Sequence, residues 1–315
     1  MQQAVSQPFV VVGEALVDVV VPQDGPVTRE PGGSPMNVAV GLCRLDVPTL
    51  LVTQLGADDD GRLVSEHAAA SGVRLAAGSV RPDMVTSTST ARLDADHAAS
   101  YTFELDWDPP PQQLPDDAVG LHVGSLAACL PPGDRVVHDL VRQADSAGMF
   151  VSYDPNLRPA FVADPRECWR QVVELAGRAR LVKVSDEDLR LAAPGSSVDA
   201  VAGTLLAGPV TELVVVTHGA RGAAAYVDGG RVEVPGTPVK VVDTVGAGDS
   251  FMAALIAVLT DWGRVAKGPG SLQTLEESRL SRLLTAAGQA AGVTCSRRGA
   301  SPPTRADLPE GWSDT

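Results

Sequence analysis

Short runs of hydrophobic residues, many of them β-branched, recur along the chain. They lie at residues 9–12, 50–52, 120–123, 150–153, 181–184 and 213–216. Longer stretches with the apolar spacing of amphipathic helices separate most of these runs. Strands that are buried on both faces of a sheet are typically continuous hydrophobic runs. The alternation therefore predicts a largely parallel sheet that is covered by helices.

Residues 86–103 depart from this alternation. They are rich in Thr and Ser, and polar and apolar positions alternate around Asp94 and Asp96. This pattern is typical of an exposed antiparallel hairpin, which can act as a lid. Residues 107–111 (WDPPP) follow, and their consecutive prolines exclude both a helix and a central strand. We interpret them as a stiff connector back to the main body.

Length, composition and charge limit the classes of function. The chain has 315 residues, of which 44% are hydrophobic, and this suits one large α/β domain or two small ones. Its 25 basic and 39 acidic residues give a formal net charge of 25 − 39 = −14, which would repel a phosphate backbone. Nucleic-acid binding is therefore not expected.

The cysteines and the N-terminus indicate the compartment. No CxxC pair and no Cys/His cluster occurs, so we expect neither a zinc site nor a disulfide framework but reduced, packed thiols at Cys43, Cys129, Cys168 and Cys295. The N-terminus has no basic region before an apolar stretch, and no run approaches the ~18 apolar residues of a membrane-spanning helix. We expect a cytoplasmic protein without a membrane anchor.

A glycine-rich turn directly before a helix carries the clearest chemical signal. Residues 243–249 (DTVGAGD) precede the apolar run at residues 252–259. Gly246 and Gly248 permit a tight turn with outward amides, and the following helix adds its positive N-terminal dipole, so the turn suits an anion such as phosphate. Asp249, at the edge of that turn, suits the base that accepts the proton of an attacking hydroxyl in phosphoryl transfer.

Taken alone, the same residues also fit a simple turn with Asp249 as a helix cap. The usual nucleotide-binding loops are absent, because the sequence has neither GxxxxGK[ST] nor GxGxxG after a strand. Residues 13–16 (GEAL) likewise lack the glycine fingerprint of an NAD-dependent enzyme. Any ATP site must therefore be built in another way.

The two motifs at residues 32–39 (GGSPMNVA) and 243–251 (DTVGAGDSF) together resemble the ribokinase-like (PfkB) family of carbohydrate kinases. Similarity in motif order runs from Gly13 to about Pro303. The resemblance implies a three-layer α/β/α sandwich with a mostly parallel central sheet and a small β lid. It also implies a single domain over residues 1–315, with lid segments at approximately residues 16–30 and 85–106.

The resemblance implies catalytic and sugar-binding residues. Gly246, Ala247 and Gly248 correspond to the anion hole, and Asp249 corresponds to the catalytic base. The residues that correspond to the sugar-binding positions are Asp18, Gly32, Gly33 and Asn37. Each of these four also has a plainer interpretation, as a turn before a helix, a first-turn polar residue or a solvated acid.

Arg158 ends a short motif at residues 154–158 (DPNLR), which follows a predicted strand. Open α/β sheets hold their ligands at the carboxyl ends of the strands, so Arg158 is a candidate contact to substrate or phosphate. A salt bridge to a helix is the alternative. The DPNLR string resembles the fructokinase and 2-keto-3-deoxygluconate kinase branches of the family more than ribokinase.

Two further segments resemble the family's nucleotide site. Residues 183–186 (KVSD) occupy the place of an Asn-x-x-Glu motif, which implies that Lys183 and Asp186 serve the phosphates of ATP and Mg²⁺. Residues 217–222 (THGARG) resemble the loop that receives the nucleotide, which implies ATP contacts for Thr217, Gly219 and Gly222.

A monovalent cation such as K⁺ is also implied by the resemblance. Asp243, the Val245 carbonyl and Gly299 correspond to the family segments that enclose such an ion. Pro303 stands where ribokinase contributes a hydroxyl residue.

The sequence as a whole therefore predicts an ATP-dependent sugar kinase, and fructose is the substrate that the combined motifs favour, with fructose 6-phosphate as the product. The alternatives are 2-keto-3-deoxygluconate, ribose or another sugar. A different class of protein with this fold would bind sugar or nucleotide as a regulator without turnover, although a pure binder needs no base at Asp249. Because lid edges often pair, a homodimer through the lid is also expected.

Overall fold

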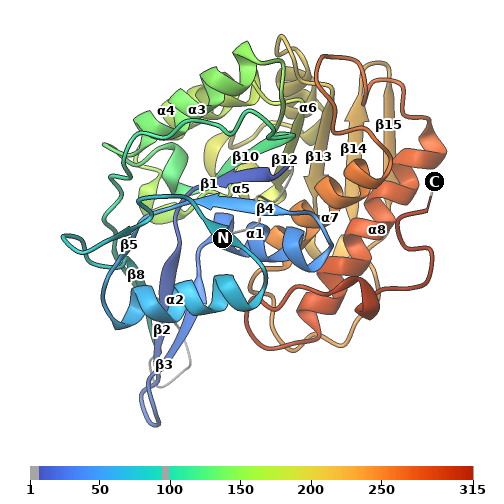
Figure 1. The fold of residues 1–315 in the computed structure, drawn as a ribbon. Coiled ribbons are helices and arrows are strands. Elements are labelled where there is room, and N and C mark those ends of the chain that lie inside the picture. The colour runs from blue at the N-terminus through green and yellow to red at the C-terminus, as the bar shows by residue number, and fades with distance from the viewer. Residues whose placement is uncertain (1–6, 94–98, 315) are drawn as a thin grey trace.

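The computed structural model describes residues 7–93 and 99–314, and a nine-stranded sheet forms its middle layer (Figure 1). Its strand order is β15-β14-β13-β12-β11-β10-β1-β4-β6. All neighbours from β6 to β13 pair in parallel. The bounds are β1 Phe9–Val12, β4 Thr49–Val52, β6 Arg74–Leu75, β10 Gly120–Gly124, β11 Phe150–Asp154, β12 Leu181–Ser185, β13 Leu213–Thr217, β14 Ala223–Val227 and β15 Gly230–Val234.

The six hydrophobic runs of the sequence coincide with β1, β4, β10, β11, β12 and β13, which confirms the predicted sheet. Nearly every residue of these strands is buried, because helices cover both faces of the sheet. The antiparallel hairpin of β14 and β15 at one edge was not anticipated from the sequence.

Helices cover the sheet from both sides. One apolar core lies between the sheet and α1 Ser34–Arg44, α2 Asp59–Ala70, α7 Ala247–Asp261 and α8 Glu277–Cys295. The other lies between the sheet and α3 Asp134–Ser146, α4 Pro165–Ala176, α5 Asp186–Ala192 and α6 Val198–Leu206. Residues 249–259 of α7 are all buried, since α1 and α8 pack against this helix as well as the sheet. The start of α7 is therefore held firmly in place.

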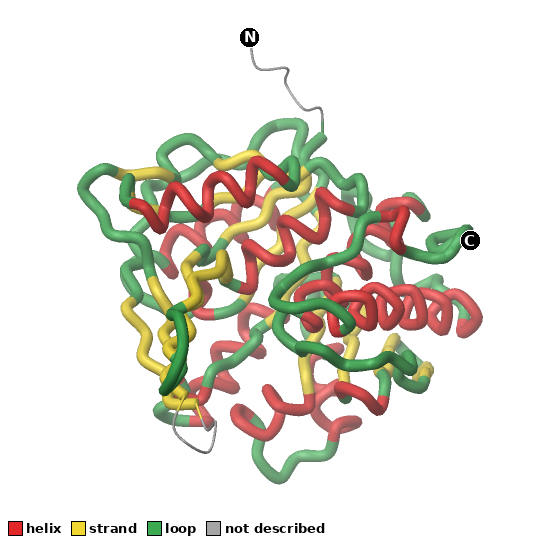
Figure 2. Tube along the Cα trace, turned by 90° about the horizontal axis from the view of Figure 1, so that it is seen from below, coloured by secondary structure: helices red, strands yellow, loops and turns green. Residues whose placement is uncertain are grey.

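A second sheet lies at one corner of the molecule in both ribbon views (Figures 1 and 2). It consists of β3 Thr28–Gly32, β2 Leu16–Val21, β8 Thr88–Leu93 and β9 Ala99–Glu104, in that order. β8 and β9 form the antiparallel pair expected within residues 86–103, while Asp94 and Asp96 lie outside the described residues. β5 Leu55–Gly56 and β7 Val80–Arg81 form a small parallel pair. The predicted fold class, an α/β/α sandwich with a small accessory sheet, is confirmed.

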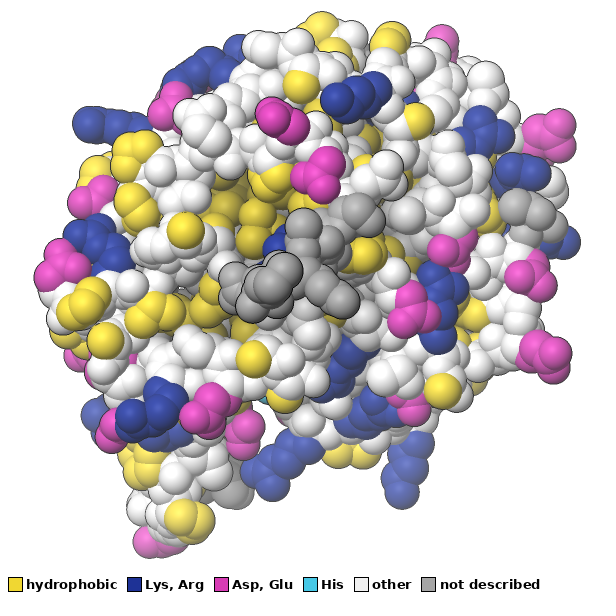
Figure 3. Space-filling model, in the orientation of Figure 1, with side chains coloured by type: hydrophobic (Ala, Val, Ile, Leu, Met, Phe, Trp, Pro, Cys, Tyr) yellow, Lys and Arg dark blue, Asp and Glu magenta, His cyan; other side chains and the backbone are white. Residues whose placement is uncertain are grey.

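Hydrophobicity, surface charge and cysteine exposure can be compared with the expectations from composition. Within residues 7–93 and 99–314, no helix has the length and apolarity needed to cross a membrane. On the face shown in Figure 3, basic and acidic side chains are interspersed. All four cysteines are free, but Cys129 is exposed, which contradicts the expectation of packed thiols for this residue. It follows the short 3₁₀ helix η1 Leu126–Ala128, where the chain reaches the surface.

Candidate active site

The glycine turn and the start of α7 form the centre of the site. Gly246 precedes the helix with φ 75°, a left-handed conformation that favours glycine. A Cβ at this position would lie 2.7 Å from the Cβ of Ala300, so a larger residue would also clash. The first N–H groups of a helix have no partner within the helix, and its dipole is positive there. The turn of Gly246, Ala247 and Gly248 can therefore receive an anion.

Asp249 is the third residue of α7, and both of its carboxylate oxygens accept hydrogen bonds from side chains of α1. Its Oδ1 accepts a hydrogen bond from the Ser34 hydroxyl at 2.7 Å, and its Oδ2 accepts one from Asn37 Nδ2 at 2.8 Å. No side-chain cap hydrogen bond occurs at the start of α7. The carboxylate thus joins the two sequence motifs, and the interpretation of Asp249 as a helix cap is wrong.

Asp18 lies against the first of the paired glycines. A Cβ on Gly32 would lie 2.1 Å from Asp18 Oδ2, and one on Gly33, where φ is 100°, would lie 2.5 Å from the Glu14 carbonyl oxygen. Burial raises the pKa of Asp18, the Ser89 hydrogen bond and Arg158 oppose the rise, and the charge of Asp249 adds to it. The accessory sheet therefore brings an acid into the electrostatic field of Asp249 and Arg158.

Arg158 lies in the loop after β11. Its Nη1 donates to Asn156 Oδ1 at 2.6 Å and to the carbonyl oxygens of Asn156 and Leu157 at 3.0 and 3.2 Å. The same loop is tied to α5, because Leu157 N donates to Asp188 Oδ1 at 2.7 Å. No salt bridge from Arg158 to a helix occurs within the described ranges, so the alternative interpretation of this residue is not supported.

Lys183 is the central residue of β12, and its side chain reaches the glycine turn. Its Nζ donates to Asp154 Oδ2 at 2.7 Å, and a Cβ on Gly248 would lie 3.2 Å from the same Nζ. Burial raises the pKa of Asp154 to about 6, the Lys183 charge opposes the rise, and Asp188 and Asp249 add to it. A buried ion pair thus lies beside the anion-binding turn.

Sequence reasoning missed Glu14, a buried carboxyl at the end of β1. Its Oε2 accepts a hydrogen bond from Ala127 N at 3.0 Å. Burial raises its pKa to about 7, against the opposing effects of a Ser125 hydrogen bond and the Arg158 charge. Ser125 itself has φ 57° and ψ −156°, which is unusual for a residue with a side chain. A single acidic residue within the otherwise nonpolar stretch of residues 9–17 was the sequence signal that could have revealed it.

The residues expected around the nucleotide lie at the carboxyl ends of β12 and β13. Asp186, the first residue of α5, forms an ion pair with Arg221 at 2.7 Å, and Arg221 belongs to the 3₁₀ helix η3 Gly219–Arg221. Thr217 is paired in register with Ser185 of β12. At Gly222 φ is 108°, and a Cβ would lie 2.0 Å from the Val234 carbonyl oxygen. The KVSD and THGARG segments are therefore neighbours at the carboxyl ends of β13 and of β12, the strand that also carries Lys183.

Asp243 connects the residues expected around a monovalent cation. Its Oδ1 accepts from Val245 N at 3.1 Å and its Oδ2 accepts from Gly299 N at 2.9 Å. The structure thus brings the 243–246 turn and the segment after α8 together through backbone N–H groups. Among the described residues, no group of three or more His, Cys, Asp or Glu side chains is arranged to hold a metal ion.

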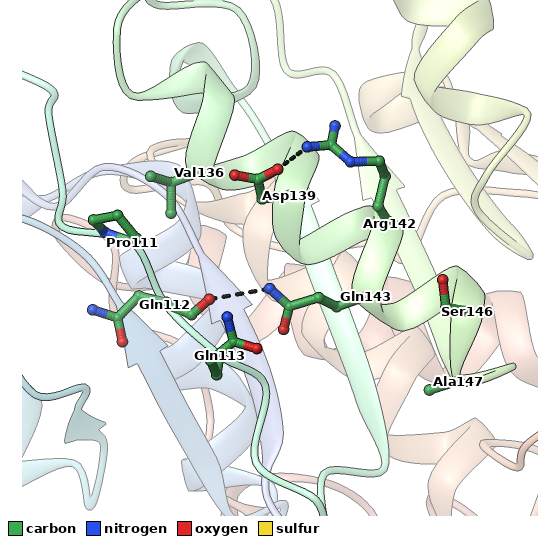
Figure 4. Close-up of a pocket in the computed structure, with 9 residues that line it drawn as sticks. All are labelled: Pro111, Gln112, Gln113, Val136, Asp139, Arg142, Gln143, Ser146 and Ala147. Atoms are coloured by element: carbon green, nitrogen blue, oxygen red, sulfur yellow. Dashed lines mark hydrogen bonds and ion pairs between the residues drawn. The ribbon is translucent and has the colours of Figure 1, made fainter.

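A surface hollow of about 670 Å³ lies elsewhere, between the proline-rich connector and α3 (Figure 4). The Gln143 amide spans it by donating to the Gln112 carbonyl oxygen at 3.1 Å, and Asp139 pairs with Arg142 on its rim. The residues that line it include none of the predicted site residues. The chemistry is therefore concentrated at the strand ends and not in this hollow.

Comparison with known proteins identifies the family. Residues 7–307 match the pfkB family of carbohydrate kinases. The chain belongs to this family. It is 33% identical over 264 residues to a fructokinase of Klebsiella pneumoniae, an alignment that covers 80% of this chain and 84% of the relative.

Solved structures of the family give the same fold. The ATP-bound fructokinase of Xylella fastidiosa superimposes with a TM-score of 0.82 at 25% identity, covering 94% of each chain. A double mutant of the Vibrio cholerae O395 fructokinase, with fructose, ADP and a potassium ion bound, gives a TM-score of 0.76 at 27% identity, again covering 94% of each chain. This family member is therefore a carbohydrate kinase with the ribokinase-like fold.

Proposed function

We propose that the chain transfers the γ-phosphate of ATP to fructose and yields fructose 6-phosphate, with Asp249 as the catalytic base. One observation carries the proposal. A buried carboxylate in the first turn of α7 is held by Ser34 and Asn37 and lies directly beside a turn that suits an anion. A binding protein has no need of a buried proton acceptor at that position, whereas phosphoryl transfer to a hydroxyl requires one.

Asp249 can accept a proton while it keeps both of its hydrogen bonds. An ionised carboxylate offers about four lone-pair sites, and Ser34 and Asn37 use one on each oxygen. The two donors fix the orientation of the carboxylate, so a sugar hydroxyl that approaches it loses its proton in one geometry. Proton removal makes the hydroxyl oxygen a better nucleophile toward the γ-phosphorus.

The glycine turn and Lys183 would stabilise the charge on the transferring phosphoryl group. N–H groups at the start of α7 point toward the anion, and the Lys183 ammonium lies beside Gly248. Asp186 and the loop of Thr217, Gly219 and Gly222 would hold the rest of the nucleotide.

The residues near the turn also fit Mg²⁺. Mg²⁺ usually binds through one or two carboxylates together with substrate phosphates and water. Asp186, the first residue of α5 directly after β12, is the carboxylate that would hold the ion, directly or through a bound water. When bound, the ion would neutralise charge on the phosphates of ATP. For K⁺, the proposed ligands are Asp243 and the carbonyl oxygens of Val245 and Gly299.

The choice of fructose rests on likeness to the relatives. The Klebsiella pneumoniae and Xylella fastidiosa proteins are named as fructokinases, and the Vibrio cholerae O395 structure contains fructose. Asp18, Gly32, Gly33, Asn37 and Arg158 would surround the sugar.

The accessory sheet is proposed as a lid over that sugar. β2 carries Asp18, and β3 leads through the paired glycines directly into α1. Closure would exclude water that could otherwise hydrolyse ATP. β3 and β9 are its outer strands, and pairing between such edges in two copies would give a homodimer, which sedimentation of the purified protein would detect.

The test is ADP release with Mg-ATP across a panel of sugars, with the Asp249→Asn variant beside the wild type. The panel contains fructose, ribose, 2-keto-3-deoxygluconate, tagatose, fructose 6-phosphate and adenosine. Fructose-dependent release that disappears in the variant supports the proposal. A higher kcat/KM for another sugar would replace fructose as the substrate, and binding without turnover of any member would favour a regulator.

A further inference from the structure

Lys183 places a buried positive charge beside the glycine turn. Its side chain is only 5% exposed, and its Nζ would lie 3.2 Å from a Cβ on Gly248. Burial disfavours the charged form of lysine and can lower its pKa by about 3–5 units. An ammonium group at this position therefore depends on a negatively charged partner.

Asp154, at the end of the neighbouring strand β11, is that partner. Its Oδ2 lies 2.7 Å from Lys183 Nζ, and its side chain is 1% exposed. Burial alone would lower the pKa of Lys183, but Asp154 raises it above the ordinary value, and Asp188 and Asp249 contribute to the rise. Asp154 is the only one of these acids that hydrogen-bonds the ammonium among the described residues.

The other titratable groups around the pair keep one protonation state near neutral pH. His122 of β10 is buried, and burial together with the Lys183 charge lowers its pKa to about 3. Burial raises the pKa of Tyr153 well above its ordinary value. Asp188 of α5 and Asp249 of α7 are the acids that would still face Lys183 if Asp154 were neutral.

We infer that Asp154 is a positioning residue for phosphoryl transfer, because it holds the Lys183 ammonium charged and in place at the turn that receives the transferring phosphate. The inference rests on the proposed function, in which that turn binds the γ-phosphate. Asp154 acts through Lys183 and not on the reacting atoms.

The experiment replaces Asp154 by asparagine, which keeps the shape and removes the charge. Two quantities are measured between about pH 7 and pH 9, a range above the pKa of Asp154, which is about 6, and below the ordinary pKa of lysine. They are kcat/KM for Mg-ATP with saturating sugar, and the Kd of Mg-ATP from calorimetry without sugar. In the wild type, neither kcat/KM nor the affinity for Mg-ATP is expected to fall through lysine deprotonation in this range. In Asp154→Asn, the pKa of Lys183 falls, and both should weaken about tenfold per pH unit above the new value.

A second buried ion pair supplies a matched control. Arg180 Nε lies 2.7 Å from Glu212 Oε1, and the side chains are 5% and 1% exposed, the same values as for Lys183 and Asp154. Within the described residues, Glu212 accepts hydrogen bonds from Arg180 and from the N–H groups of Gly270 and Leu272, and none of these is a proposed site residue. Glu212→Gln should therefore lower thermal stability but leave the shape of both pH profiles unchanged.

A double-variant cycle tests whether Asp154 acts through Lys183. In a Lys183→Met background, Asp154→Asn should reduce kcat/KM by less than about twofold further, because the ammonium that Asp154 supports is gone. The double variant carries neither buried charge, so it remains informative if the single Asp154→Asn variant folds poorly because of its unpaired ammonium group.

The outcomes separate the two proposals. Parallel pH profiles for the wild type and Asp154→Asn, or full additivity in the cycle, would overturn the positioning role. A wild type that binds Mg-ATP but phosphorylates no sugar would refute the proposed function, and the Kd profiles would then decide the role of Asp154 alone. A wild type that does not bind Mg-ATP would refute both.

Discussion

Replacement of Asp249 by asparagine removes the proposed base with little change of structure. In the wild type, Oδ1 accepts from the Ser34 hydroxyl and Oδ2 accepts from Asn37 Nδ2. The asparagine can point its oxygen toward Asn37 and its NH₂ toward Ser34, because a hydroxyl rotates and accepts as readily as it donates. Both hydrogen bonds are then retained, now between neutral and not charged groups.

The effect on stability should be small and the effect on turnover large. Hydrogen bonds to charged groups contribute about 1.5–3 kcal/mol and neutral ones about 0.5–1.5 kcal/mol, and removal of a buried charge offsets part of that loss. We expect the free energy of unfolding to change by no more than about 2 kcal/mol. Loss of a general base lowers kcat by about 10²–10⁴-fold, which corresponds to about 3–5 kcal/mol of transition-state stabilisation.

The assay is sugar-dependent ADP release under saturating Mg-ATP, together with the Kd of the sugar from calorimetry and urea unfolding of both proteins. The expected result is a large loss of kcat with a Kd for the sugar within about threefold of the wild type. A kcat within about fivefold of the wild type, with intact folding, would remove Asp249 from the mechanism. As a comparison, Ser34→Ala keeps the base but loosens it, so it should cost only about tenfold in kcat.

Three further predictions concern Glu14, the glycine turn and the proposed lid. The pKa of Glu14 rises from 4.5 to about 7 on folding, so the folded state binds the proton more tightly than the unfolded state. The free energy of unfolding of the wild type should therefore fall by up to about 3 kcal/mol as the pH rises from about 4.5 to 7. Urea unfolding of Glu14→Gln should lack this pH-dependent loss. Gly246→Ala must adopt φ 75° and places its Cβ 2.7 Å from another Cβ. The melting temperature and kcat of this variant should therefore both fall further than those of Gly263→Ala, where φ is 64° and no heavy atom lies within 4 Å. Phe161 makes an edge-to-face contact with Phe103 of β9, with ring centroids 5.3 Å apart. Such a pair contributes about 0.5–1.5 kcal/mol. Phe161→Ala should therefore raise the KM for sugar about two- to tenfold and leave the KM for ATP unchanged.

The central sheet could be predicted because each buried parallel strand is a continuous hydrophobic run that stands out locally. The hairpin of β14 and β15 was missed although Asp228 and Gly229 between its strands are a typical hairpin signal. β14 is also an alanine-rich segment with low strand propensity, so packing against β13 determines its conformation rather than its own sequence.

The position of Asp249 in the site could be predicted, but its partners could not. Ser34 and Asn37 lie 215 and 212 residues away in sequence, and only the packing of α1 against α7 brings them to the carboxylate. The same holds for Glu14, whose hydrogen bond to Ala127 spans 113 residues. Such contacts depend on how helices and loops pack and on how their side chains are oriented, which hydrophobic periodicity does not specify.

The polar residues that interrupt the buried strands nevertheless carry a signal. His122, Ser152 and Lys183 each occupy the middle position of a five-residue strand and are flanked there by apolar residues. A buried polar group is costly unless it is hydrogen-bonded, so each must find a partner, and in a parallel sheet the nearest candidates lie on the adjacent strands. His122 indeed lies opposite Ser152 and within 3.0 Å of its hydroxyl, and Lys183 pairs with Asp154 at the end of the next strand. Once the strand order is known, these interruptions predict polar contacts between β10 and β11 and between β11 and β12. The second of these contacts, Lys183 with Asp154, lies beside the glycine turn, where the proposed chemistry requires a positive charge.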